Sequence, residues 1–164
     1  MAAVAVPQVQ FSDLDRLRAL VTDEYGAWGP ALEVTQPMID AFADVSGDRQ
    51  WIHVDVERCE TESPFGAPIA HGFLTLSIFP RLSVRAVELT GHGSAVNYGI
   101  DRLRFLSPVR VGDRIHGRAR VAAVEPRGPN VLVTTDLEVR GVEADRPAVL
   151  CSMLALYLPP GSDS

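Results

Sequence analysis

The chain contains no lysine, because all fifteen of its basic residues are arginine. Without lysine it cannot form a Schiff base, hold pyridoxal phosphate or complete a Walker phosphate loop. It also lacks the GxGxxG motif of dinucleotide-binding proteins and the GxSxG motif of serine hydrolases. Any chemistry must therefore use histidine, carboxylates, hydroxyl groups and the backbone.

Basic patches and long apolar runs are also missing. The formal net charge is −6, which argues against a nucleic-acid partner, and no apolar run is long enough to cross a bilayer. Residues 1–7 lack the charged region of a secretory signal, so a cytoplasmic location is predicted. At 164 residues, 46% of them hydrophobic and 22% charged, the chain is expected to form one domain over 1–158 with a disordered tail at 159–164.

Cysteine is scarce: only Cys59 and Cys151 are present. Two thiols are too few for a structural zinc site, and nothing surrounds them in metal-ligand spacing. Both are expected to be free and buried, and the sequence indicates neither a metal nor a cofactor.

The first half of the chain predicts three helices. Ser12 opens a short helix to about Val21, and Thr35 caps a second that ends at Ser46-Gly47. The segment 48–55 has no helical period, and a loop rich in proline and glycine follows it. Residues 71 to about 88 are apolar around most of a helical circumference, which predicts a helix buried on nearly all sides and bent at Pro80.

The second half alternates between apolar and polar residues, which is typical of strands. Strands are predicted at about 95–106, 114–125, 130–142 and 147–158, and residues 31–34 could supply a fifth. Short turns between them favour antiparallel neighbours. One apolar helix and an antiparallel sheet predict an α+β fold in which a curved sheet wraps around a long central helix.

Two features carry the chemistry. Asp48 and His53 lie five residues apart in an irregular segment, so both side chains can converge on one water molecule, and the apolar Trp51 and Ile52 favour a partly dry pocket. Gly72 stands at the start of the apolar helix. Its free amide can donate a hydrogen bond to a substrate carbonyl, and the missing side chain lets that carbonyl come close. Acid–base catalysis and an oxyanion donor are the predicted roles.

With these residues identified, the sequence resembles the MaoC-like hydratases, a hotdog-fold family that includes (R)-specific enoyl-CoA hydratases and NodN-like proteins. The resemblance runs from about residue 34 to 157. It rests on three ordered motifs: Phe42-Ala-Asp-Val-Ser-Gly-Asp48-Arg-Gln-Trp-Ile-His53-Val-Asp55, Pro64-Phe-Gly-Ala-Pro-Ile-Ala-His71-Gly72-Phe-Leu-Thr-Leu76, and Asn97-Tyr-Gly-Ile-Asp-Arg-Leu-Arg-Phe105 with Ser107-Pro-Val-Arg-Val-Gly-Asp113.

The resemblance implies a sheet wrapped around a helix and paired with a second copy in a homodimer. It implies that Asp48 and His53 activate a water that adds to C3 of a trans-2-enoyl thioester, that the Gly72 amide binds the thioester carbonyl, and that the product is (3R)-hydroxyacyl. Residues predicted to contact substrate are Trp51, His71, Phe73, Leu76, Asn97 and Arg102, the last with Arg104 and Arg110 as candidates for CoA phosphates.

The sequence departs from the family pattern at two places. Gln50-Trp51 stands where Asn-Pro is common, and this Gln-Trp variant is a feature of the NodN-like branch. Asp101 stands where asparagine is common. Ser77 is the nearest candidate for a helix serine that assists the site in some relatives.

Three alternatives stay open at this point. Hotdog folds also carry acyl thioesterases, although these generally place a carboxylate on the central helix, where residues 71–88 offer only Glu88. A non-catalytic subunit of a hydratase heterodimer is the second alternative. The third concerns the substrate, which can be an acyl-CoA or an acyl-carrier-protein thioester.

Overall fold

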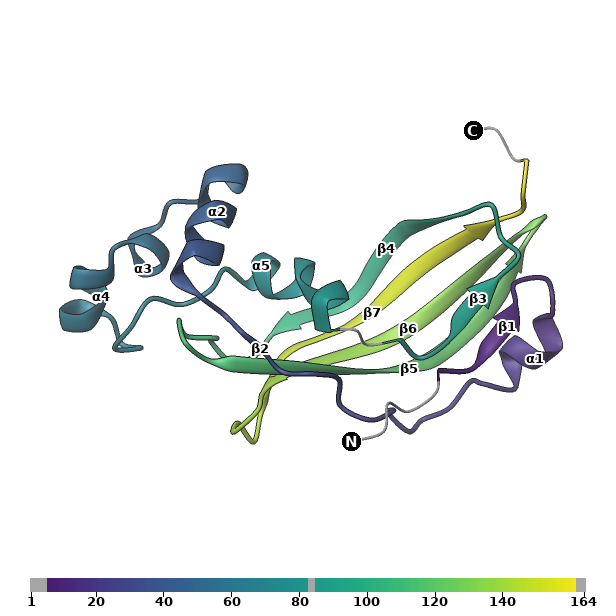
Figure 1. Cartoon of the computed structure of the whole chain (residues 1–164), viewed down its shortest axis with the longest axis horizontal. Helices are drawn as coiled ribbons and strands as arrows, with labels where there is room; N and C mark the ends of the chain where they lie inside the picture. Colours follow the sequence, from purple (N-terminus) through teal and green to yellow (C-terminus); the bar gives the residue numbers. More distant parts are fainter. Residues whose placement is uncertain (1–5, 83–84, 162–164) are drawn as a thin grey trace.

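The computed structural model describes residues 6–82 and 85–161, and its frame is a five-stranded antiparallel sheet (Figure 1). The strand order is β2-β5-β6-β7-β4, so β4, the first long strand in the chain, lies at the edge beside the last. The four long strands and the short fifth confirm the strand predictions. Their bounds are β2 Leu32–Glu33, β4 Ser94–Phe105, β5 Arg114–Arg127, β6 Asn130–Gly141 and β7 Pro147–Leu158.

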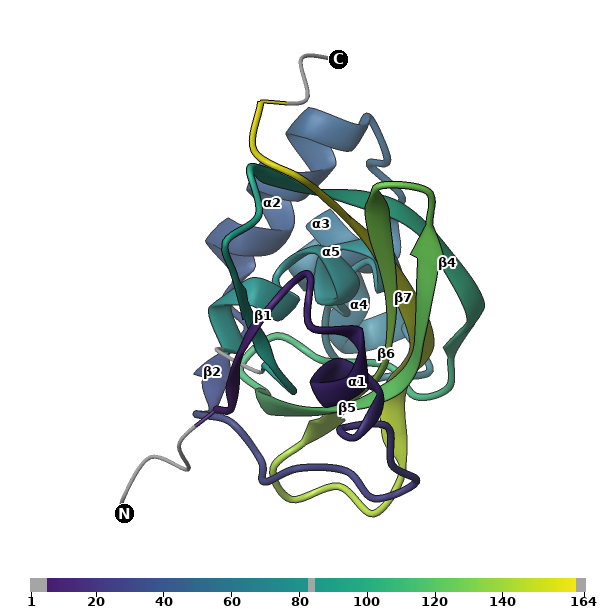
Figure 2. The same ribbon diagram turned by 90° about the vertical axis from the view of Figure 1, so that its right-hand side faces the viewer.

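The sheet curls around the short helix α5, Gly72–Ser77 (Figure 2). Alternate residues of the strands face this helix, as the period of two requires. Ile115 and Ala119 of β5, Val139 of β6 and Val149 of β7 are buried in one cluster with Leu74 of α5. The concave face of the sheet therefore holds the main core.

The central helix is shorter than the sequence predicts. The α-helix ends at Ser77, and a 3₁₀ turn, η1 Phe79–Leu82, continues it. Pro80 explains the change, because proline has no N–H and its ring clashes with the preceding turn of an α-helix. Residues 83–84 lie outside the described part, and Glu88 begins a strand instead of ending a helix. The long helix is thus corrected to two short pieces. Each of them is buried on part of its surface only, because Phe73, Ser77 and Arg81 are exposed.

Helix α2, Gln36–Ser46, confirms its sequence signals. Thr35 is the N-cap residue, Pro37 lies in the first turn, and Gly47 ends the helix with a left-handed φ of 78°, which glycine adopts without steric cost. Two further helices follow, α3 Trp51–Val54 and α4 Val56–Glu62. The sequence predicts loops there, because one or two turns are too short to show a helical period. Together α2, α3 and α4 extend beyond one end of the sheet (Figure 1).

The opposite end of the sheet is closed by N-terminal segments. Strand β1, Gln8–Gln10, pairs in parallel with β3, Glu88–Thr90, and neither strand was predicted. Helix α1, Leu14–Arg18, is shorter than expected, and its cap is Asp13 instead of Ser12. The Asp13 carboxylate accepts a hydrogen bond from the Arg16 amide at 3.1 Å. Leu17, Val9 and Leu89 pack with β5 and β6 residues in a second core cluster.

The convex face of the sheet carries a charged network. Arg120 of β5 bonds the carboxylate of Asp136 on β6 at 2.8 and 3.1 Å and that of Asp23 at 2.7 Å. The Ser152 hydroxyl of β7 donates to the same Asp136 carboxylate at 2.6 Å. Asp136 is 7% exposed, so its charge depends on these partners.

Within the described residues, none of the helices is long and apolar enough to cross a membrane. Of the tail predicted at 159–164, residues 162–164 lie outside the described part.

Candidate active site

His53, which the sequence predicts to belong to the acid–base pair, has a buried side chain. It lies on α3, is 6% exposed, and its Nδ1 lies 2.6 Å from the backbone oxygen of Ile69. A carbonyl oxygen only accepts hydrogen bonds, so Nδ1 carries the proton and donates it. The lone pair of Nε2 is therefore left to accept a proton, and His53 is one of the residues that line a cavity.

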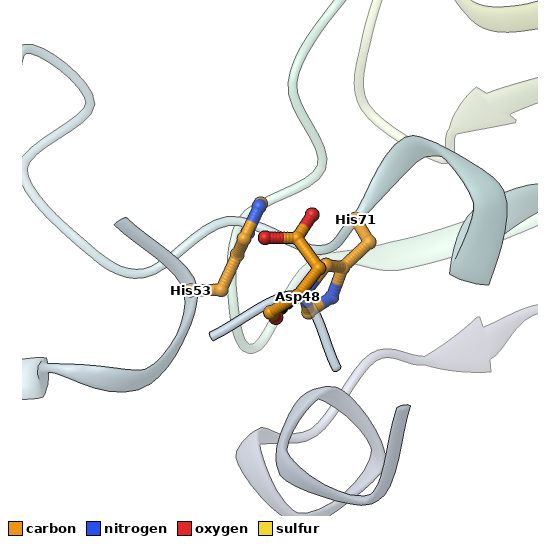
Figure 3. A group of neighbouring side chains, drawn as sticks. All are labelled: Asp48, His53 and His71. Atoms are coloured by element: carbon orange, nitrogen blue, oxygen red, sulfur yellow. Dashed lines mark hydrogen bonds between the residues drawn. The ribbon is translucent and has the colours of Figure 1, made fainter. Parts of the chain in front are cut away.

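Asp48 lies in the segment between α2 and α3, just after the left-handed turn at Gly47. Its Oδ1 accepts a bond from the Gln50 amide at 3.3 Å. Figure 3 shows the carboxylate beside a ring nitrogen of His53, and one donor atom from each of Asp48, His53 and His71 lies within 4.8 Å of the others. The pair predicted from the sequence spacing is therefore brought together.

His71 backs this pair. Its Nε2 lies 2.8 Å from the backbone oxygen of Asp48, and its ring stacks on that of His53 with centroids 3.7 Å apart and planes 28° apart. Phe42 of α2 packs on it from another direction at 5.0 Å. His71 is 4% exposed, and its Nδ1 is buried without a hydrogen-bond partner in the described structure.

The pKa of His53 is lowered from its ordinary value of 6.5. Burial is the main cause, because it disfavours the charged ring, and the nearby His71 acts in the same direction. The bond to Ile69 and the charge of Asp48 oppose the shift but do not cancel it. His53 is therefore neutral at pH 7, as a base that accepts a proton from water requires.

Next to His53 is a cavity of about 300 Å³ with mostly apolar walls. Gly72 and Thr75 of α5 line this cavity together with His53. The ring of Phe105 packs against Gly72, because a Cβ atom built there would lie 2.8 Å from it. The remaining lining residues come from two loops and β7: Phe65, Ile69, Ala70, Leu106, Ser107, Pro108, Val109, Ala148 and Val149.

Asp48, His53 and His71 also form a possible set of metal ligands, with two imidazoles and one carboxylate. Metal binding needs both ring lone pairs to point at one ion. The two rings are stacked with only 28° between their planes, so in-plane lone pairs run side by side instead of converging. The arrangement suits one water shared by Asp48 and His53 better than a metal ion.

The predicted substrate contacts divide into two groups. Gly72 lines the cavity, His71 packs behind the base, and Phe73, 61% exposed, meets the cavity residue Phe105 edge-to-face at 5.3 Å. Leu76 is buried in the core cluster and does not line the cavity.

The other three candidates lie away from the cavity. Trp51 packs under the guanidinium of Arg58 at 4.2 Å, and Asn97 is exposed on β4 opposite Ala155. Arg102 donates to the Ser152 hydroxyl at 2.9 Å. Since Cys151 and Met153 face the core, Ser152 faces the convex side. The side chain of Arg102 therefore reaches over the face opposite to the core.

Thr75 is a cavity residue that sequence reasoning missed. Its side chain is 2% exposed and its hydroxyl donates to the backbone oxygen of His71 at 3.3 Å. Ser77, the hydroxyl considered instead, is exposed and bonds the Leu74 oxygen at 3.0 Å. The available signal was a hydroxyl residue within an apolar stretch of the predicted helix, but Thr75 and Ser77 share it, so the sequence alone does not separate them.

Comparison with known proteins agrees with this geometry. Residues 27–142 match the family model described as MaoC like domain, and the chain belongs to that family. It is 41% identical over 127 residues to Nodulation protein N of Rhizobium leguminosarum bv. viciae, covering 76% of this chain and 79% of that protein. It is 40% identical over 128 residues to 3-hydroxyacyl-thioester dehydratase Z of Mycobacterium tuberculosis, covering 76% and 83%.

A solved structure of the (R)-hydratase from A. caviae involved in PHA biosynthesis has a TM-score of 0.61 with this chain. The two are 27% identical, and the match covers 83% of this chain and 97% of that one. Structural likeness confirms the hotdog fold, and the dehydratases and hydratases among the relatives support an enzyme of the hydro-lyase kind.

Proposed function

We propose that this protein is an (R)-specific enoyl-thioester hydratase, which also runs in reverse as a 3-hydroxyacyl-thioester dehydratase. The observation that carries the proposal is that the Asp48 carboxylate lies within 4.8 Å of a ring nitrogen of His53, and that His53 and Gly72 line the same mostly apolar cavity. The names of the dehydratase and (R)-hydratase relatives support the same reaction.

In the proposed mechanism one water donates hydrogen bonds to Asp48 and to Nε2 of His53. His53 takes one proton of this water as the water oxygen bonds to C3 of the trans-2-enoyl thioester. The same proton is then passed from Nε2 to C2, which completes the addition of water and leaves His53 neutral again. The negative charge that develops on the thioester oxygen is stabilised by the amide of Gly72. An amide of this kind is commonly worth about 10²–10³ in rate.

We further propose that the protein acts as a homodimer through the free edge of β4. Beyond its pairing with β7, this strand of 12 residues is exposed along almost its whole length. Its exposed apolar side chains include Val96, Tyr98, Ile100 and Phe105. Long apolar edges are normally covered in soluble proteins, and a second copy would cover this one. The cytoplasmic location stays a prediction.

A thioesterase is less well supported. The segment that contains α5 and η1, residues 72–82, carries no carboxylate, and Glu88 belongs to β3. The described part of the central helix therefore offers no carboxylate to direct a water at the thioester carbon.

The test follows the absorbance of the conjugated enoyl thioester when purified protein is added to crotonyl-CoA, with free thiol measured in parallel. Asp48→Asn removes the carboxylate charge. His53→Asn keeps a donor near the position of Nδ1, which can still bond Ile69, and removes the basic Nε2. Each variant is expected to lose about 10²–10⁴ in kcat.

Asp145→Asn, an exposed carboxylate in the turn between β6 and β7, is the matched control and should keep full activity. Chiral analysis of the product should give the (3R)-hydroxyacyl form. Release of free thiol would establish a thioesterase instead, and full activity in the His53 variant would overturn the assigned base. Assay of an enoyl-carrier protein beside crotonyl-CoA separates the two kinds of thioester.

A further inference from the structure

Asp48 and His53 both contact a second histidine, His71, which the proposed mechanism does not use. His53 and His71 stack face to face, and each places one ring nitrogen on a backbone oxygen, His53 on that of Ile69 and His71 on that of Asp48. Because carbonyl oxygens accept only, Nδ1 of His53 and Nε2 of His71 both carry protons. Two backbone carbonyls therefore fix two complementary tautomers.

We propose that His71 is a positioning residue, which holds Asp48 by its backbone and His53 by its ring so that both meet the same water. The proposal deepens the proposed function and rests on it. Asp48 itself is exposed and follows a turn at Gly47. Within its own segment it makes two bonds of 3.3 Å, from its amide to the Ser46 hydroxyl and from the Gln50 amide to its Oδ1. The bond from His71 spans 23 residues of sequence and ties this segment to the start of α5.

The place of His71 in the chain strengthens the case. It is the N-cap residue of α5, and the next residue is Gly72, whose amide we propose to bind the substrate carbonyl. Any shift of His71 would therefore move the carboxylate, the base and the carbonyl site relative to one another. Misplacement by about 1 Å at a reacting centre can cost about 10²-fold in rate.

The ring of His71 also acts on the charge of His53. The titratable groups that face this ring are Asp48 and His53, and Phe42 covers it from α2. Flat contact at 3.7 Å keeps water away from His53 and disfavours a positive charge on it, in line with the lowered pKa of His53. His71 thus keeps the base unprotonated as well as in place.

Two variants separate these contributions. His71→Gln keeps a donor that can reach the Asp48 oxygen and removes the stacked ring, whereas His71→Phe keeps a flat ring and removes the donor. We expect His71→Phe to lower kcat by about 10-fold or more with a smaller change in KM, because Asp48 is released. We expect His71→Gln to keep more of kcat at alkaline pH and to move the acidic limb of the kcat/KM profile upward by about half a unit or more.

The second readout does not depend on activity. The imidazole resonances of His53 are followed by NMR against pH in the wild type, His71→Gln and the control His92→Gln, whose histidine packs on Tyr157 away from the site. A rise in the pKa of His53 in His71→Gln, with no rise in His92→Gln, supports the proposal even if crotonyl-CoA is not a substrate. A lack of activity on crotonyl-CoA would count only against the proposed function. An unchanged His53 titration, or full kcat in a folded His71→Phe variant, would overturn it.

Discussion

Substitution of Gly72 by alanine should destabilise the protein when Phe105 is present, and should not destabilise it when Phe105 is replaced by alanine. A Cβ at Gly72 would lie 2.8, 2.8 and 2.9 Å from Cδ1, Cγ and Cδ2 of the Phe105 ring, whereas carbon atoms normally meet at about 3.5–4.0 Å. The ring atoms nearest the main chain are involved, so a small rotation of the side chain does not relieve the contact. Overpacking of this kind costs about 1–3 kcal/mol.

A second effect acts in the opposite direction. Alanine is favoured over glycine by about 1 kcal/mol inside a helix, and by less in its first turn. Gly72→Ala alone is therefore expected to destabilise the protein by about 1–2 kcal/mol. In a Phe105→Ala background the contact is absent, so the same change should be neutral or stabilising by up to about 1 kcal/mol.

Urea unfolding of the four proteins of this cycle, at one protomer concentration, measures both effects. The comparison is made within each background, so the cost of Phe105→Ala itself cancels. Equal destabilisation by Gly72→Ala in both backgrounds would refute the account of the Gly72–Phe105 contact.

Three further predictions follow from burial and charge. Burial lowers the pKa of His53 and of His116, so the stability that depends on their neutral forms is fully present above about pH 6.5. It is lost as the pH falls below that value, by at most about 1.4 kcal/mol per pH unit for each histidine. Thermal unfolding from pH 8 to 5 should show the loss, and His53→Gln should reduce it. Arg120→Met leaves its buried carboxylate partner with fewer contacts and should cost about 3 kcal/mol in urea unfolding, whereas Arg127→Met, at an exposed pair, should cost less than about 1 kcal/mol. Burial raises the pKa of Cys151 to about 11, so a thiol reagent at pH 8 should react with it only after unfolding; rapid labelling of the native protein would contradict this.

The parts of the fold that could be predicted are those with strong local signals. Thr35, Pro37 and Gly47 mark both ends of α2, and alternation of apolar and polar residues marks strands such as β5 and β6. Strands of three residues such as β1, and a helix of four such as α3, contain too few residues to show a period. The apolar run after His71 predicted a buried helix, and Leu74, Leu76 and Phe79 are buried, but the run could not reveal which side stays exposed or where the α-helix gives way to a 3₁₀ turn.

Arg102 shows why alternation along a strand did not assign every site residue. Its φ of 52° is the only positive value at a non-glycine residue in the described chain, and the pairing of β4 with β7 shifts register between Asp101 and Arg104. A bulge of this kind changes which side chains share a face of the sheet. Neither the shift nor the reach of Arg102 to Ser152 follows from the residue pattern.

The convergence of Asp48 and His53 was predictable from spacing, but what fixes it lies elsewhere in the chain. The segment from Pro68 to His71 is tied on both sides. Ile69 donates its amide to the Ile52 oxygen at 3.0 Å and accepts from His53, while Ala70 donates to the Val109 oxygen at 2.7 Å.

These bonds join the helices that extend beyond the sheet to the loop after β4, which lines the cavity. The segment ends at His71, which holds the backbone of Asp48, and Gly72 follows it directly. One short stretch of backbone therefore sets the base, the carboxylate and the carbonyl site together. For this reason a change in residues 68–71 should disturb the site more than a change in the Asp48 segment that leaves Asp48 itself intact.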